Sequence, residues 1–251
     1  MLRAVVISLA PLLFLAACRE SRPATDDVPT VLARQLAPDA IRVDGVLEAA
    51  WERAGSTGAF VHPGSGAVVT GSPVNATARI AWDARRLLCA FAVRDRHPTS
   101  PFPRGQEDPH IWARASGVEL MVQPGDHGDN RSYFEVQVDV NGAVWDTRFD
   151  DYNQPITGPP GARRFGHQQW RSRLERAVKV ERGRAYTIEI GIPWDALRTD
   201  RARTPPGPGD TWRMNLYSFR DGQRAALAWS PILGRGNFHR ASRFGRVRFV
   251  R

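Results

Sequence analysis

The chain has 251 residues, a length that suits one large domain or two small ones and is ample for a buried core. Hydrophobic residues make up 42% of it and charged residues 24%, a balance that excludes both a disordered chain and a polytopic membrane protein. The 22 glycines and 19 prolines separate many short apolar runs, which favours an all-β protein over a helical one.

The net charge of +9 is concentrated at one end of the sequence. Residues 201–251 contain eleven arginines and two acidic residues, whereas residues 1–200 are balanced. Such a segment is either a solvated basic edge or an anion-binding surface. Lys179 is the single lysine of the whole chain, so the arginine excess indicates coding bias more than selection for phosphate binding.

The N-terminus has the pattern of a secreted lipoprotein. Residues 1–17 combine a short basic start with a mostly apolar stretch that is too short to span a bilayer and is typical of a signal peptide. The stretch ends in Leu15-Ala16-Ala17-Cys18, which resembles a bacterial lipobox and implies cleavage before Cys18 and lipidation of its thiol. Several acyl chains give stable anchoring. In such lipoproteins an aspartate directly after the lipidated cysteine retains the protein in the inner membrane. Residue 19 is Arg, so we expect the protein at the outer membrane, periplasmic or surface-exposed.

The remaining chain divides into a linker and a domain. Residues 18–40 contain scattered charges and several prolines without periodicity, which predicts a tether between the anchor and the folded part. Residues 41–251 then form the globular domain. The second cysteine, Cys89, lies in a continuous apolar run and is expected to be a buried small hydrophobe, so no disulfide forms within the monomer.

Short segments with the character of strands follow one another through residues 41–251. Strands are predicted at 41–43, 74–82, 86–93, 118–122, 133–140, 143–149, 174–180, 186–192, 212–219, 227–230 and 244–250. Asn141-Gly142 is the strongest hairpin signal among the turns between them. A helix is predicted at 46–53 and a helical turn at 193–197. The pattern predicts an all-β antiparallel β-sandwich, jelly-roll or immunoglobulin-like, with one or two short helices.

Three long loops, 96–115, 150–170 and 199–210, are rich in Pro or Gly, and loops of this length are usually functional or mobile. Trp112 lies in a polar part of the first loop. An exposed tryptophan on a loop is typical of a binding site.

Six short motifs, in this order, resemble the family 9 carbohydrate-binding modules and their DOMON-like β-sandwich relatives. The motifs are Val43–Trp51, the paired segments Ala78–Asp83 and Leu87–Asp95, Val118–Pro124, Tyr133–Gly142, Tyr186–Trp194, and the closing Trp229-Ser230-Pro231 with Phe244–Val247. The resemblance covers residues 41–251. It implies a non-catalytic β-sandwich that binds oligosaccharide or polysaccharide and supports polysaccharide degradation. Two tryptophans of such modules clamp a sugar ring between their faces, while polar side chains fix the hydroxyl groups.

Carried over residue by residue, the resemblance implies a carbohydrate-binding site made by Trp112, Glu119, Glu135, Gln137 and Trp229. Trp229 matches the tryptophan of the closing segment, Trp112 is the candidate for the other jaw, and Glu119 matches the acidic ligand of the central strand. This sequence has Glu135 and Gln137 at positions where the family has Arg and Asn. The side chains that would hydrogen-bond to the sugar hydroxyls therefore differ from those of the family. The basic residues 201–251 add the expectation of an acidic glycan, such as a uronate.

The resemblance also implies structural calcium, a cation that prefers clustered oxygen ligands. Asp83 and Asp95, near strand ends, are the candidate ligands. The sequence contains no linear calcium loop of the EF-hand kind.

Two other functions remain open. Related sandwiches bind haem through His and Met, but Met121 and Met214 both fall in apolar strand patterns, which favours core positions. Glu119 and Glu135 could be a pair of carboxylates for glycoside hydrolysis. The sequence has no nucleophile elbow, zinc motif or phosphate loop. We therefore expect a binding module rather than an enzyme, without a nucleic-acid partner.

Overall fold

A computed structural model of the chain describes residues 28–251, except 155, 157–165 and 223. The predicted signal peptide at 1–17, Cys18 and the first part of the linker lie outside the described residues. Within the described part of the chain, no helix is long and apolar enough to cross a membrane.

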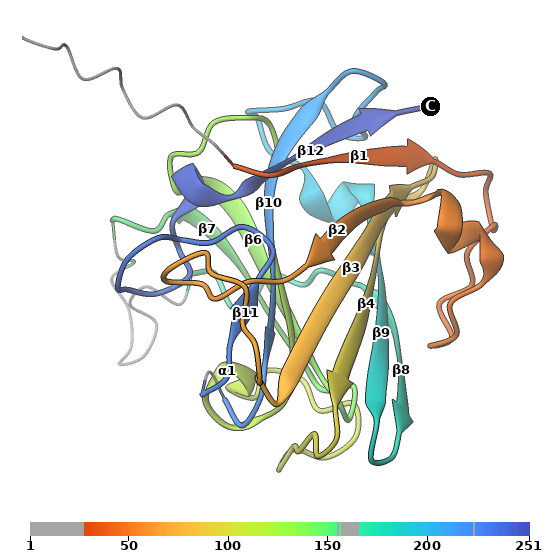
Figure 1. The fold of residues 1–251 in the computed structure, drawn as a ribbon. Coiled ribbons are helices and arrows are strands. Elements are labelled where there is room, and N and C mark those ends of the chain that lie inside the picture. Colours follow the sequence, from red (N-terminus) through yellow and green to blue (C-terminus); the bar gives the residue numbers. More distant parts are fainter. Residues whose placement is uncertain (1–27, 155, 157–165, 223) are drawn as a thin grey trace, which may run out of the picture.

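Strands dominate the described residues, and the helices are short (Figure 1). The strands are β1 (Thr30–Gln35), β2 (Gly55–Ala59), β3 (Val74–Trp82), β4 (Arg86–Asp95), β5 (Gly117–Gln123), β6 (Arg131–Asp139), β7 (Val144–Asp151), β8 (Glu175–Glu181), β9 (Ala185–Pro193), β10 (Thr211–Phe219), β11 (Leu227–Ala228) and β12 (Gly245–Val250). The helices are α1 (Ile111–Arg114) and the 3₁₀ turns η1 (Ala49–Arg53), η2 (Trp194–Leu197) and η3 (Ala241–Arg243). The all-β prediction is confirmed.

The strands follow the order β7-β6-β5-β10-β12-β1-β3-β4-β9-β8, with β2 added to β3 and β11 to β10. The path curls, so that β7-β6-β5-β10 and β3-β4-β9-β8 form two layers joined through β12 and β1 (Figure 1). Neighbouring strands on this path are antiparallel except β1, which runs parallel to both β12 and β3. The predicted sandwich is confirmed, with a mixed rather than purely antiparallel sheet.

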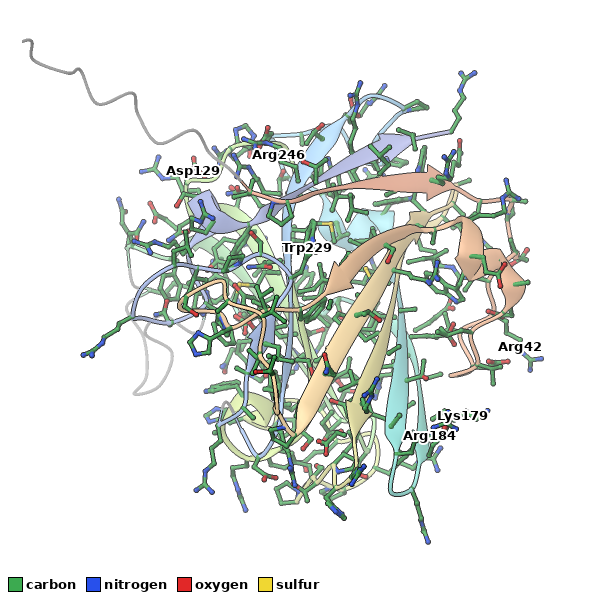
Figure 2. All side chains as sticks on the ribbon, in the orientation of Figure 1. Arg42, Asp129, Lys179, Arg184, Trp229 and Arg246 are labelled. Carbon is green, nitrogen blue, oxygen red and sulfur yellow. The ribbon has the colours of Figure 1, made fainter. Side chains whose placement is uncertain are left out.

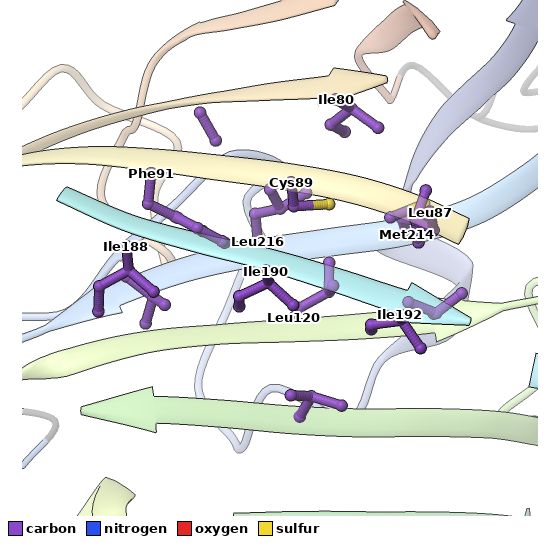
Figure 3. Packing of buried hydrophobic residues seen from close by; sticks show 14 of the residues in the cluster. Ile80, Leu87, Cys89, Phe91, Leu120, Ile188, Ile190, Ile192, Met214 and Leu216 are labelled. Atoms are coloured by element: carbon purple, nitrogen blue, oxygen red, sulfur yellow. The ribbon is translucent and has the colours of Figure 1, made fainter. Parts of the chain in front are cut away.

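The main core fills the space between the two layers. Alternation along β5 points Leu120 inward, and Leu216 of β10 lies beside it, while Phe91 and Ile190 come from the opposite layer (Figure 3). All four side chains are at most 1% exposed. Cys89 lies in the same core, as predicted. Burial of a large aliphatic or aromatic side chain contributes about 1.5–3 kcal/mol, so this layer contact is the main source of stability.

The predicted linker at 18–40 is wrong for its last part, because residues 30–35 form β1. Val31 and Ala33 of β1 are buried and alternate with exposed Leu32 and Arg34. The strand is hydrogen-bonded between β12 and β3 and closes the path between the two layers. Its apolar alternation is short and flanked by prolines, a pattern that is also typical of a linker. The folded domain therefore includes β1, which lies within the predicted linker, and is not limited to residues 41–251.

The helix predicted at 46–53 is shorter than expected. Its last residues form η1, which buries Trp51, whereas Val46 and Leu47 are 46% and 38% exposed. Strand β2 was not predicted, since its sequence Gly-Ser-Thr-Gly-Ala has no apolar alternation.

Buried Glu189 of β9 holds the beginning of the domain against the sheet. Its Oε2 accepts hydrogen bonds from the backbone N–H groups of Asp44 (3.0 Å) and Gly45 (2.6 Å), and its Oε1 accepts one from the Trp51 indole at 2.7 Å. Gly45 has φ +89°, and a Cβ there would lie 3.1 Å from the Cβ of Lys179. The Asp-Gly turn, the tryptophan and the glutamate of two distant motifs are thus one structural unit.

We expect Glu189→Ala to lower the free energy of unfolding by about 3 kcal/mol, because several donors lose their only carboxylate partner. Urea unfolding followed by tryptophan fluorescence measures the change. Glu181→Gln, an exposed change at the end of β8, is the control and should stay within about 0.5 kcal/mol of wild type. Equal stability of the two variants would contradict the role given to Glu189.

Candidate functional site

The outer face of the β7-β6-β5-β10 layer carries three of the five predicted site residues. Glu119 of β5 is the cross-strand partner of Gln137 on β6, and Glu135 lies two residues before Gln137 on the same face. Although this face points away from the main core, the three side chains are only 1–3% exposed. The centre of this face is therefore shielded by the segments that flank it, while Trp112 and His239 at its edges are partly exposed.

Two apolar clusters flank these polar residues on the outer face. One contains Met121, Tyr133, Phe149, Tyr152, Tyr217, Ala228, Ile232, Phe238, Ala241 and Phe244, and the other contains Ile111, Ala115, Ala143, Trp145 and Phe219. The first cluster includes residues of the segment 228–244, and the second includes residues of α1 and its loop. These two segments, which are far apart in the sequence, therefore lie on either side of Glu119, Glu135 and Gln137.

The Gln137 amide joins the two glutamates. Its Nε2 donates to Glu119 Oε2 at 3.0 Å and to Glu135 Oε1 at 2.7 Å. Its Oε1 accepts a hydrogen bond from the backbone N–H of Trp112 at 3.1 Å. Both amide hydrogens and the amide oxygen are used, so the orientation of the side chain is fixed. Gln137 thus connects the carboxyl pair with the loop that bears Trp112.

Trp112 is half-buried at the edge of the site. Its ring stacks on His110 with centroids 4.6 Å apart and meets the edge of Trp145 at 4.7 Å. Buried Ile111, the preceding residue, anchors the short helix α1 beneath it. The predicted first jaw is therefore adjacent to the polar residues that were expected to accompany it.

His239 belongs to the site and was not singled out by sequence reasoning. Its Nε2 lies 3.6 Å from Glu135 Oε2, and its Nδ1 lies 2.6 Å from the Tyr133 hydroxyl. The ring stacks on Tyr152 with centroids 3.9 Å apart and planes 9° from parallel. No spacing relates His239 to the strands β5 and β6, so only the fold reveals this contact.

The carboxyl pair has unusual electrostatics. Burial raises the pKa of Glu119 well above its ordinary value, and the charge of nearby Glu135 raises it further. Burial also raises the pKa of Glu135 to about 8, although the hydrogen bond from Gln137 lowers it. Tyr133 and Tyr217, beside the pair, have raised pKa values chiefly because they are buried. At neutral pH the pair therefore retains protons that exposed glutamates would have lost.

Trp229 is not part of this site, which corrects the predicted second jaw. It is 4% exposed and lies in the main core between the two layers. In Figure 2 it lies within the body of the protein, whereas Arg42 and Arg184 project from its rim. A Cβ on Gly245 would meet the Trp229 ring at 2.5 Å, so the closing glycine leaves room for the indole. A ring enclosed in this way offers no face to a sugar.

The calcium ligands predicted at Asp83 and Asp95 do not fit a shared site. They lie at opposite ends of the β3–β4 hairpin, since Trp82 pairs with Leu87 and Val74 pairs with Asp95. Asp83 already faces a cation: its Oδ2 lies 3.4 Å from the Nε of buried Arg86. Among the described residues, no group of three or more His, Cys, Asp or Glu side chains could hold a metal ion.

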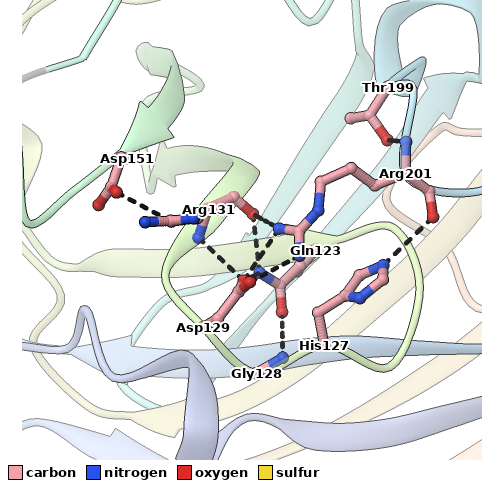
Figure 4. A network of polar contacts seen from close by, with 8 residues as sticks. All are labelled: Gln123, His127, Gly128, Asp129, Arg131, Asp151, Thr199 and Arg201. Atoms are coloured by element: carbon pink, nitrogen blue, oxygen red, sulfur yellow. Dashed lines mark hydrogen bonds and ion pairs between the residues drawn. The ribbon is translucent and has the colours of Figure 1, made fainter.

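Three arginines of the basic C-terminal segment, Arg201, Arg213 and Arg246, contact acidic residues of the loop between β5 and β6. Arg201 forms an ion pair with Asp129 at 2.6 Å in a network that includes Gln123 and Arg131 (Figure 4). Arg246 lies 2.9 Å from Asp126, which also pairs with Arg213. These arginines fasten the loop between β5 and β6 to the C-terminal strands.

Comparison with known proteins agrees with the fold and with the motif order. The family described as "Carbohydrate family 9 binding domain-like" matches residues 43–251. The chain belongs to this family. No curated protein matches the chain.

Solved structures of the family share the fold at low sequence identity. A candidate carbohydrate-binding protein from Bacteroides uniformis ATCC 8492 is 18% identical, with a TM-score of 0.65, and the match covers 88% of this chain and 99% of that one. A family 9 module from Caldicellulosiruptor kristjanssonii in complex with cellotriose is 15% identical, with a TM-score of 0.55 over 86% and 93% of the two chains. A family 9 module from Caldicellulosiruptor kristjanssonii in complex with glucose is 15% identical, with a TM-score of 0.54 over 87% of this chain and 96% of that one.

The raised pKa of the carboxyl pair predicts a specific dependence of stability on pH. A folded-state pKa above the unfolded value means that the native state binds the proton more tightly, so stability falls as pH rises from 4.5 through about 8. One such proton changes the free energy of unfolding by about 1.4 kcal/mol per pH unit. We expect Glu135→Gln to flatten this fall, as measured by urea unfolding across that range.

Glu181→Gln is the matched control and should retain the wild-type slope, because Glu181 is an exposed residue at the end of β8. An identical slope in Glu135→Gln and wild type would show that Glu135 loses its proton at the ordinary pH.

Proposed function

We propose that this protein is a non-catalytic carbohydrate-binding module whose site is the outer face of the β7-β6-β5-β10 layer. The observation that carries the proposal is the convergence of Trp112, Glu119, Glu135 and Gln137 on that face within a family 9 fold. Two solved relatives hold cellotriose and glucose, which supports a saccharide as the ligand.

The chemistry of these side chains suits a sugar. The half-buried Trp112 ring offers an apolar surface to the C–H face of a pyranose ring. Glu119, Glu135 and Gln137 offer hydrogen-bonding groups for hydroxyls at the base of the site. His239 and Tyr152, stacked on each other, lie beside Glu135 and take the place that had been expected for Trp229.

The ligand is not expected to be acidic, although the net charge of the chain pointed to a uronate. The ionisable groups closest to Gln137 are carboxyls, which offer no positive charge to a sugar carboxylate. Arginines 201, 213 and 246 are engaged with Asp126 and Asp129 instead.

The two alternatives have less support from the placement of their residues. Met121 and Met214 are buried in separate apolar clusters, one on each face of the sheet, where neither offers a ligand to haem iron. Glu119 and Glu135 share one amide donor, Gln137, which holds both carboxyls at the sheet surface. Hydrolysis of a glycoside needs the scissile bond between the two carboxyls, and the Gln137 amide lies between them here.

We expect Trp112→Ala to weaken binding of oligosaccharide about thirtyfold, the effect of removing about 2 kcal/mol of aromatic contact. Isothermal titration calorimetry with a panel of cello-, xylo- and amino-oligosaccharides provides the measurement. Leu47→Ala, which changes an exposed apolar residue beside η1, is the control and should bind like wild type. Unchanged affinity in a folded Trp112→Ala protein would remove Trp112 from the site.

We further propose that Cys18 is lipidated and holds the domain at the outer membrane, on the periplasmic or outer surface. The support is the sequence Leu15-Ala16-Ala17-Cys18 at the end of the apolar leader. The described domain begins at residue 28, so about ten residues separate the lipidated cysteine from the first strand.

Replacement of the two cysteines separates anchoring from folding. We expect Cys18→Ser to move the protein from the membrane fraction of cells to the soluble fraction, because the acyl chains supply the membrane affinity. Cys89→Ala, which removes the other thiol, should leave it in the membrane fraction. Retention of the Cys18→Ser protein in the membrane fraction would contradict a lipid anchor.

A further inference from the structure

The carboxyl pair has more acceptor capacity than the protein uses. Glu119 Oε1 and Glu135 Oε2 are buried and have no hydrogen-bond partner among the described residues. Their other oxygens share the two hydrogens of the Gln137 amide. Unsatisfied buried carboxyl oxygens cost about 1–3 kcal/mol or more each, so a site that retains two of them is suited to a ligand that donates to both.

No positive side chain neutralises the pair at close range within the described part of the chain. The nearest basic group to Glu135 is the His239 ring at 3.6 Å, and it is charged only when protonated. The other ionisable groups around the pair are Tyr133 from β6, Tyr217 from β10 and Tyr152, which follows β7. None of these tyrosines carries a positive charge, so no described group compensates the charge of the pair when it is ionised, although the whole chain has a charge of +9.

From these contacts we infer that the preferred ligand is a sugar bearing a free ammonium group, as in a glucosamine unit, which donates to Glu119 Oε1 and Glu135 Oε2. This inference rests on the proposed carbohydrate-binding function and specifies the class of sugar. An ammonium group has three hydrogens and a full positive charge, which matches two carboxyl acceptors. An equatorial hydroxyl donates one hydrogen, so it satisfies only one of the two oxygens and does not compensate an ionised pair.

The positive net charge of the protein excludes non-specific attraction as the cause of a preference for an amino sugar. A chain of charge +9 repels a cationic oligosaccharide over long distances, so non-specific attraction does not imitate the local preference. An ammonium group also displaces the proton that the buried pair retains near neutral pH, and this proton passes to the buffer. Tight binding of an amino sugar is therefore accompanied by proton release, whereas binding of a neutral sugar is not.

Three tetrasaccharides with the same β-1,4 backbone and different groups at carbon 2 provide the test. Cellotetraose has a hydroxyl there, the glucosamine tetramer an ammonium group, and the N-acetylglucosamine tetramer an acetamido group. Titration calorimetry at mildly acidic pH, where both the amines of the glucosamine tetramer and the buried pair are protonated, measures affinity and proton release together when it is run in two buffers of different ionisation enthalpy. We expect the glucosamine tetramer to bind at least about tenfold more tightly than cellotetraose, with proton release, and the acetylated tetramer no more tightly than cellotetraose.

Substitutions test whether the carboxyl pair causes the preference for the ammonium sugar. Glu135→Gln should reduce the ratio of glucosamine-tetramer affinity to cellotetraose affinity about tenfold, because one charged acceptor is lost. Glu181→Gln removes a carboxylate at the end of the β8–β9 hairpin and should keep the wild-type ratio. The melting temperature of each variant shows that it is folded, and the wild-type comparison of three sugars stands without the variants.

The outcomes separate this inference from the function on which it rests. Equal affinity for cellotetraose and the glucosamine tetramer, or tightest binding of the acetylated tetramer, would overturn the ammonium preference and leave carbohydrate binding in place. Failure of all three tetrasaccharides to bind would overturn both.

Discussion

Both faces of the β7-β6-β5-β10 layer are buried, and this constraint governs the rest of the molecule. The inner face can be wholly apolar, because it meets the opposite layer across the main core. The outer face carries Glu119, Glu135 and Gln137, whose polar atoms have left water and need partners from the protein. The loop that contains α1 and the segment 228–244 cover that face and supply some of those partners.

The Gln137 amide lowers the free-energy cost of burying two carboxyls on the outer face. Two carboxyls on neighbouring strands repel each other when both are charged, and burial makes the charged forms still less favourable. A neutral amide with two hydrogens satisfies one oxygen of each without introducing a positive charge. An arginine at this place would form ion pairs with both glutamates and remove their capacity to bind another group. The pair therefore keeps acceptor capacity because its bridge is an amide.

The sequence predicted the fold well because most of the motif residues are structural. Period-2 alternation located the strands of both layers, and Asn141-Gly142 located the hairpin between β6 and β7. Asp44, Gly45, Trp51 and Glu189 belong to two separate motifs and form one hydrogen-bonded unit in the structure. Strand β1 was missed because a strand of six residues flanked by prolines has too few apolar residues to stand out from a linker.

The site was predictable only where it lies on regular strands. Glu119, Glu135 and Gln137 occupy one face by alternation, and the structure brings them into contact as expected. Trp229 illustrates the limit, since a tryptophan near the end of a short predicted strand is consistent both with a binding surface and with the core. The deciding fact, the space that Gly245 leaves for its ring, comes from a residue sixteen positions away.

His239 shows what such distant contacts add to the chemistry of the site. Its Nδ1 faces the Tyr133 hydroxyl, so in a neutral ring that accepts this hydrogen bond the proton lies on Nε2, toward Glu135. At 3.6 Å the ring nitrogen lies beyond hydrogen-bond distance of Glu135 Oε2 and leaves this oxygen unsatisfied. Stacking on Tyr152 holds the ring in this orientation. A ligand that brings a stronger donor to Glu135 gains from the same burial that makes the empty carboxyl unfavourable, because a low-dielectric surrounding strengthens each charge-assisted hydrogen bond formed within it.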